Sequence, residues 1–170
     1  TGTIISSSVY STSSIKSYAH GMFQSVYDYP YLSSSANHLF DITIGQTAGS
    51  PGSASLTVDP FSKKKINIYN QMAQVLAGHD VTGSIMQFDR DGDPATGGDK
   101  MTSMFFLNFS RLLSKDEIKK GSFQMTLGVN SSSLEPFNAT CLVTDTNGAT
   151  NYKINSPSGE YGILYATNIT

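Results

Sequence analysis

The chain has 170 residues and a net charge of −2, with 38% hydrophobic, 11% aromatic and 14% charged residues. This length allows one domain with a hydrophobic core, and the aromatic content with the low net charge excludes a disordered chain. The near-neutral balance gives no electrostatic basis for binding nucleic acid, and no apolar run reaches the roughly 18 residues of a membrane span. We therefore expect a folded protein without a membrane span or a nucleic-acid partner.

Low charge with abundant Ser, Thr, Tyr and Gly is typical of β-rich extracellular or particle-forming proteins. The only cysteine, Cys141, excludes an intrachain disulfide, and its apolar neighbours indicate a buried thiol. The chain begins at Thr1 without Met and ends in an apolar, strand-like stretch. We expect a processed product or a piece of a longer protein.

Residues 1–37 are predicted to form an extended arm that is rich in Ser and Tyr. The stretch YAHGMFQSVYDYPY within it carries one acidic side chain and has no helical period. So many aromatic side chains need a surface to lie against, either the body of the chain or a neighbouring subunit. Because Tyr, Phe and Met are enriched at interfaces, we predict that the arm contacts a neighbouring subunit. The predicted contact residues are Tyr18, Phe23, Tyr27, Tyr29 and Tyr31.

Residues 38–170 are predicted to form a single β-rich domain. The alternation of apolar and polar residues from His38 to Gly45 predicts a half-buried strand. A helix is predicted next, with Asp59 as its N-cap and Pro60 at its first position. Gly78 is placed to end this helix, and its apolar stripe predicts packing of one face against a sheet.

In the middle of the chain, Val81 to Phe88 and Met101 to Phe109 are predicted strands, separated by the polar loop Asp89 to Asp99. A capping box from Ser114 to Glu117 predicts a short helix that Gly121 ends.

The alternation from Phe123 to Val129 predicts a further strand. The Asn147-Gly148 pair is a strong turn signal, and it predicts a hairpin between residues 139–144 and 149–154. A last strand is predicted at 160–166. The elements together favour a mainly β, α+β fold: an antiparallel sheet or sandwich with one packed amphipathic helix, one short helix and the extended N-terminal arm.

Acidic residues in the polar loop suggest a calcium site formed by Asp89, Asp91 and Asp93. Oxygen ligands at alternate positions suit a hard cation. An EF-hand loop, however, would place Gly and Glu where this loop has Pro94 and Lys100. The alternative interpretation is a surface turn in which the Asp side chains accept hydrogen bonds from their own backbone.

The sequence contains none of the short motifs that mark nucleotide-binding, zinc-peptidase or nucleophile-elbow sites. Its histidines, His20, His38 and His79, share no metal-ligand spacing. A Ser-His-Asp triad assembled in space stays open, because its members need no fixed spacing. We expect no cofactor and no enzymatic activity.

The phrases INIYNQMAQVLAGHDVTGSIMQFDRDGD and MFFLNFSRLLSKDEIKKGSFQMTLGV, within Lys65 to Val129, and the ending GEYGILYATNIT resemble virion structural proteins of large tailed phages. The similarity is to T-even-like myoviruses of cyanobacteria. It implies a component of the tail, baseplate, neck or capsid surface that is repeated by symmetry. Its partners would be copies of itself and other virion proteins, and it implies no catalytic residues.

The expected function is therefore that of a structural subunit of a symmetric assembly, located in the virion. The alternative is a secreted or surface module that binds glycans, with or without calcium. In that case the tyrosines of the arm would stack on sugar rings, although the chain has no Trp, which offers the largest face for such stacking.

Overall fold

The computed structural model describes residues 15–28, 37–50, 60–110, 117–129, 139–145 and 148–169. Over these residues the protein is mainly β, with antiparallel sheets and one helix, which confirms the predicted fold class. The chain divides into two compact units, residues 1–115 and 116–170, whereas a single domain over 38–170 was expected. No helix in the described ranges has both the length and the apolar character needed to cross a membrane.

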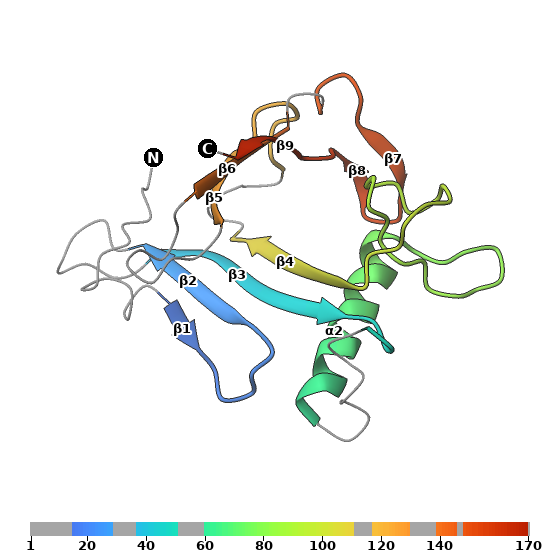
Figure 1. Cartoon of the computed structure of the whole chain (residues 1–170), viewed down its shortest axis with the longest axis horizontal. Helices are drawn as coiled ribbons and strands as arrows, with labels where there is room; N and C mark the ends of the chain where they lie inside the picture. The colour runs from blue at the N-terminus through green and yellow to red at the C-terminus, as the bar shows by residue number, and fades with distance from the viewer. Residues whose placement is uncertain are drawn as a thin grey trace. The chain divides into compact units, whose positions relative to one another are not determined.

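The first unit contains a four-stranded antiparallel sheet in the order β1-β2-β3-β4 (Figure 1). Its strands are β1 (Ile15–Ser17), β2 (Gln24–Asp28), β3 (Asn37–Gln46) and β4 (Ser103–Phe109). The predicted strands at 38–45 and 101–109 are thus confirmed. The long central strand β3 pairs with β2 on one side and with β4 on the other, so it holds the sheet together.

The predicted extended arm differs from the structure in the part that is described. Residues 15–28 form β1 and β2, a hairpin whose second strand pairs with β3 over five residues. Val26 is buried in this pairing. The stretch has no clear period of its own, so the sequence predicts an extended arm, but its strands are stabilised by β3, which is distant in sequence. Tyr29 and Tyr31 lie outside the described residues.

The helix α2 (Pro60–Leu76) begins at the proline predicted for its first position; its predicted N-cap, Asp59, lies outside the described residues. Gly78 ends it as expected, with a φ of 89° that suits glycine and with its N–H donating to the carbonyl of Ala73 at 2.9 Å. The helix packs on β3, as the amphipathic pattern predicted.

The core of the first unit lies between α2 and one face of the sheet. Ile68, Tyr69 and Ala73 of the helix are buried there. The Tyr69 hydroxyl donates to the Met101 carbonyl at 2.7 Å and accepts from the Phe88 N–H at 3.2 Å. This tyrosine therefore ties α2 to the segment that leads into β4.

The predicted strand from Val81 to Phe88 is wrong. The segment makes one isolated bridge, between His79 and Ile85; residues 81–83 form a turn, and residues 86–88 are irregular. The cause is Asp80, whose carboxylate accepts hydrogen bonds from the N–H groups of Thr82 and Ser84 and so closes a turn. The apolar residues that suggested a strand are partly solvent-facing, and Val81 is fully exposed.

The second unit holds a three-stranded antiparallel sheet in the order β5-β6-β9 and a two-stranded hairpin. The sheet contains β5 (Gln124–Val129), β6 (Ala139–Thr144) and β9 (Tyr165–Ile169), and the hairpin contains β7 (Lys153–Ser156) and β8 (Gly159–Tyr161). The strand predicted at 123–129 is confirmed, whereas the single strand predicted at 160–166 is replaced by β8 and β9.

The hairpin predicted around Asn147-Gly148 is wrong, because β6 pairs with β5 and β9 and not with residues 149–154. Of the predicted short helix, Ser114 to Asp116 lie outside the described residues. Residues 117–119 are irregular, and Gly121 lies in a turn with a φ of 78°.

Candidate functional site

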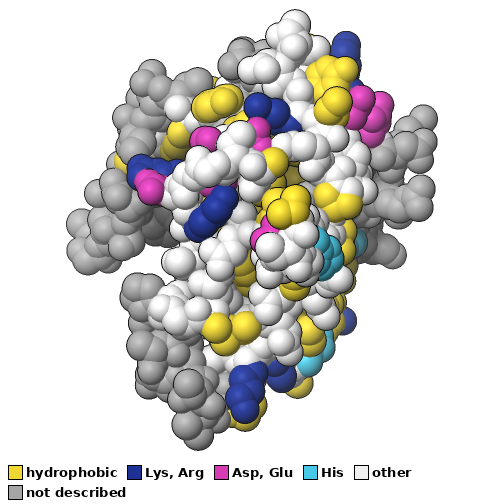
Figure 2. Space-filling view, turned by 90° about the vertical axis from the view of Figure 1, so that its right-hand side faces the viewer, with side chains coloured by type: hydrophobic (Ala, Val, Ile, Leu, Met, Phe, Trp, Pro, Cys, Tyr) yellow, Lys and Arg dark blue, Asp and Glu magenta, His cyan; other side chains and the backbone are white. Residues whose placement is uncertain are grey.

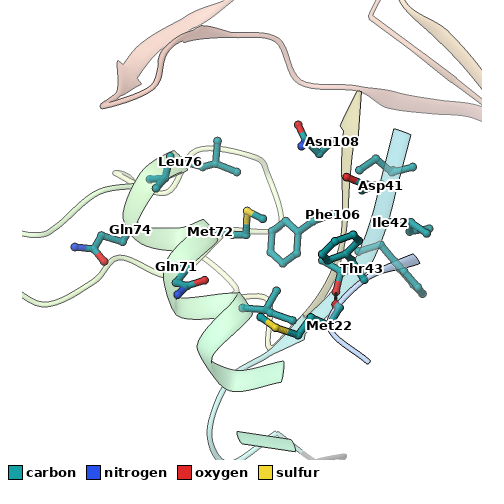
Figure 3. A pocket seen from close by; sticks show the side chains of 15 residues that line it. Met22, Asp41, Ile42, Thr43, Gln71, Met72, Gln74, Leu76, Phe106 and Asn108 are labelled. Atoms are coloured by element: carbon teal, nitrogen blue, oxygen red, sulfur yellow. Dashed lines mark hydrogen bonds between the residues drawn. The ribbon is translucent and has the colours of Figure 1, made fainter. Parts of the chain in front are cut away.

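A groove of about 870 Å³ lies between α2 and the strands β3 and β4. Figure 3 shows Met72 of α2 and Phe106 of β4 extending into it, with Met22 at the end nearer the β1–β2 turn. Asp41 and Asn108 lie toward the opposite end, where they are direct partners in the β3–β4 register. The groove is thus mainly apolar, and its charged residue, Asp41, lies beside Asn108 at what we call the polar end, while Thr43, Gln71 and Gln74 line other parts of it.

The polar end continues into a chain of hydrogen bonds across the sheet, which we call the polar chain: Tyr18, Ser25, Asp41 and His38. The Ser25 hydroxyl donates to Asp41 Oδ1 at 2.5 Å, and Tyr18 Oη lies 3.1 Å from Ser25 Oγ. His38 Nε2 lies 2.8 Å from the same Oδ1 atom. Asp41 is therefore held by its neighbours on β2 and β3 while it borders the groove.

A β-bulge makes this arrangement possible. In the β2–β3 pair, Val26 is opposite Phe40, but the next pair joins Tyr27 to His38, so that Leu39 is skipped. In a regular strand His38 and Asp41 would point to opposite faces, since successive side chains alternate. The extra residue brings both side chains to the same face, as bulges near functional sites often do.

Hydrogen bonding affects the two tyrosines of this region in opposite directions. The contact with Ser25, followed by that with Tyr27, lowers the pKa of the Tyr18 phenol. The contact with Tyr18 raises the pKa of the Tyr27 phenol. At the other end of the groove, burial lowers the pKa of Lys65, whose ammonium lies 3.4 Å from the Met22 carbonyl.

The polar chain contains Ser, His and Asp, but its geometry is not that of a catalytic triad. In a triad the histidine stands between the serine and the aspartate and takes the proton of the serine. Here the Ser25 hydroxyl and His38 Nε2 both contact Asp41 Oδ1, and Ser25 is 2% exposed. The arrangement therefore positions a carboxylate; it does not activate a nucleophile.

No family model, curated protein or solved structure matches the chain.

The structure places three of the predicted contact residues in or beside this site. Tyr18 belongs to the polar chain, Tyr27 stacks obliquely on His38 at 5.4 Å between ring centroids, and Phe23 borders the groove. Tyr18 also stacks on His20 at 5.1 Å. These side chains therefore contact other residues of the first unit. The sequence pattern did not reveal these contacts.

Sequence reasoning missed Ser25, His38 and Asp41 as a cluster. The one local signal of this cluster was Asp41, an acidic residue inside a predicted half-buried strand. A charge in such a place needs hydrogen-bond or ion-pair partners. The partners themselves come from strand pairing and from the bulge, neither of which can be read from spacing.

The predicted calcium residues are used within their own loop. Asp89, Asp91 and Asp93 each accept a hydrogen bond from the N–H two residues further along, which agrees with the alternative of a self-capping turn. The Lys100 ammonium also lies 2.9 Å from Asp89 Oδ2. Within the described ranges, no three His, Cys, Asp or Glu side chains gather into a metal-binding group, so the geometry gives no support to a calcium site at this loop.

The ion pair between Asp89 and Lys100 predicts a specific acid response. The hydrogen bond from Lys100 lowers the pKa of Asp89 below its ordinary value of 3.8. The stability that this pair contributes is therefore complete above pH 3.8 and is lost as the pH falls further. In Lys100→Met the pKa of Asp89 rises, so we expect acid unfolding, followed by circular dichroism, to begin at a higher pH.

The matched control is Arg90→Met. Arg90 lies 3.9 Å from Asp99 with both side chains more than 80% exposed, so this pair should contribute little. If the pH midpoint of acid unfolding shifts equally in both variants, the ion pair between Lys100 and Asp89 contributes no more to stability than the exposed pair does.

Proposed function

We propose that the chain is a structural subunit of a symmetric assembly, a virion component of a tailed phage. The main support for assembly is that few apolar side chains are buried in the chain and many are exposed. Among the described residues, six apolar side chains are buried: Val26, Ile68, Tyr69, Ala73, Ala77 and Cys141. Fifteen large hydrophobic side chains are exposed, and Figure 2 shows such side chains at several places on one surface. Scattered single residues of this kind are normal, but a contiguous group marks a contact surface.

Such a group lies on β3 and β4, at positions that alternate with Gly45 and Phe106, the residues beside Tyr69 of α2. Ile44 and Phe105 are direct partners in the β3–β4 register and are 41% and 67% exposed. The next pair on this face, Ile42 and Leu107, is half-buried. We call these four residues the outer face.

The strand β4 adds a second argument. It is the last strand of the sheet order, and its sequence SMFFLNF contains no charge and no proline. Proteins usually protect edge strands with charges, prolines or bulges, because a bare apolar edge promotes association. The edge strand β1 at the other side is only three residues long and carries Lys16. The contrast favours β4 as a strand that is covered in the assembled state.

The second unit supports the same conclusion. In its described part Cys141 is the one buried apolar side chain, whereas Leu127, Leu142, Ile154 and Tyr165 are exposed to between 39% and 74%. Small domains need most of their apolar residues in a core to fold alone. Coverage by neighbouring subunits would supply the missing burial. The virion location is supported only by the resemblance of the sequence to tailed-phage proteins.

The test is Phe105→Ser. Because Phe105 is largely exposed, its loss should change the folding stability of the chain by no more than about 1 kcal/mol. At an interface, loss of an aromatic side chain costs about 2 kcal/mol or more, so association should weaken at least tenfold. Sedimentation velocity should show the assembly shifting toward the 18.3 kDa chain.

Val81→Ser is the matched control, since Val81 is fully exposed but lies in the loop after α2. It should leave the sedimentation profile unchanged. An assembly that is unaffected by Phe105→Ser, or equally weakened by both variants, would remove the outer face from the proposal.

A further inference from the structure

The groove beside α2 combines an apolar body with a single charged group. Phe23, Phe106 and Met72 provide aromatic and thioether surface, and the amides of Gln71 and Asn108 border it. Asp41 is the one charged residue among the lining side chains. A volume of about 870 Å³ falls within the range of small-molecule sites, which typically have apolar walls and few, well-placed polar groups.

Asp41 is oriented for a ligand at the polar end. Within the described part of the chain, its hydrogen bonds from Ser25 and His38 both reach Oδ1. Its side chain remains 26% exposed, and the carboxylate can accept further hydrogen bonds through Oδ2. Figure 3 shows a carboxylate oxygen of Asp41 directed toward the groove, with the Asn108 amide nearby.

The charges around the groove favour a cation. At the opposite end, the Lys64 and Lys65 ammonium groups are engaged by the carbonyls of His20 and Met22, so they are not directed toward Asp41. An anionic ligand would meet the Asp41 carboxylate, whereas an ammonium group would pair with it. Aromatic faces such as those of Phe23 and Phe106 also attract cations.

We propose that this groove binds a small organic ammonium compound, whose apolar body lies along Phe106 and Met72 and whose ammonium donates to Asp41. Ile42, Phe105 and Leu107 of the outer face also line this groove, so the proposal is tested by ligand binding and not by the state of assembly. An aryl-alkylammonium ion is the simplest molecule that matches both the apolar walls and the single carboxylate.

The experiment is isothermal titration calorimetry at pH 8 with three probes of the same length: 4-phenylbutylammonium, 4-phenylbutanol and 4-phenylbutyrate. We expect the ammonium probe to bind the full chain at least tenfold more tightly than the alcohol, which corresponds to about 1.4 kcal/mol. The butyrate should bind most weakly. Equal binding of the ammonium and alcohol probes, or binding of none of the three probes, would overturn the proposal.

Two variants locate the binding. Asp41→Asn should abolish the preference for the ammonium probe, while Asp99→Asn, which alters an 86% exposed carboxylate outside the groove, should keep it. Met72→Trp should fill the groove and weaken all three probes. If circular dichroism shows that Asp41→Asn does not fold, Asn108→Leu replaces it and should reduce the preference. If the folded Asp41 or Asn108 variant keeps the full preference for the ammonium probe over the alcohol, the ammonium does not bind at Asp41 and the proposal is overturned.

Discussion

Gly45→Ala is expected to destabilise the first unit by about 3 kcal/mol or more. A Cβ atom at this position of β3 would lie 2.9 Å from both the N and the Cα atoms of Tyr69 and 2.8 Å from a ring carbon of Phe106. The phenyl ring can turn aside, but the backbone of Tyr69 belongs to α2 and cannot. The Tyr69 hydroxyl is in turn bonded to the segment before β4, so α2 would have to leave the sheet.

Urea unfolding monitored by the helix signal in circular dichroism measures this effect. Gly97→Ala is the control, because a Cβ there has no atom within 4 Å and its change should stay within about 0.5 kcal/mol. A Gly45→Ala protein as stable as the control would mean that α2 does not lie against β3 as described.

Gly148→Ala should have an equally large effect on the second unit. The new Cβ would lie 1.9 Å from Oδ1 of Asp145, a residue that is only 7% exposed. The carboxylate has no room to move, because Gly162 lies close to it on another side and the Gly121 N–H donates to its Oδ2 at 2.8 Å. Displacement would break this hydrogen bond to a buried charge, so we expect a loss of about 3 kcal/mol or more.

Amide hydrogen exchange distinguishes where this loss occurs. We expect protection to fall in β5 and β6 while it is retained in β3 and β4, because these strands belong to different compact units. In the control, Gly159→Ala, the added Cβ meets no atom within 4 Å, and only the strain of a φ of 106° remains, about 1–2 kcal/mol. Equal loss of protection in both units would show that they unfold as one.

The elements that could be predicted from the sequence are those fixed by local patterns. The alternation in β3 and β5 and the proline and glycine at the ends of α2 each reflect the geometry of one segment, so they were found with nearly correct bounds. The hairpin predicted from the Asn147-Gly148 pair is wrong because β6 has two other partners, β5 and β9. Long-range pairing overrode a strong local preference there.

The candidate site could not be predicted for the same reason. Ser25 and Asp41 meet because β2 pairs with β3, and His38 joins them because of a bulge at Leu39. The groove depends in addition on the packing of α2 over the same face. The predicted contact of the arm's aromatic residues with a neighbouring subunit stays a prediction. Of these residues, Tyr18, Phe23 and Tyr27 contact other residues of the first unit itself.

The most direct test of the proposed assembly is the mass of the unmodified chain in solution, measured by light scattering over a wide range of concentrations. The proposal predicts a defined multiple of 18.3 kDa that persists on dilution, as expected when the outer face and β4 are covered by neighbouring subunits. A folded 18.3 kDa monomer at every concentration would contradict it.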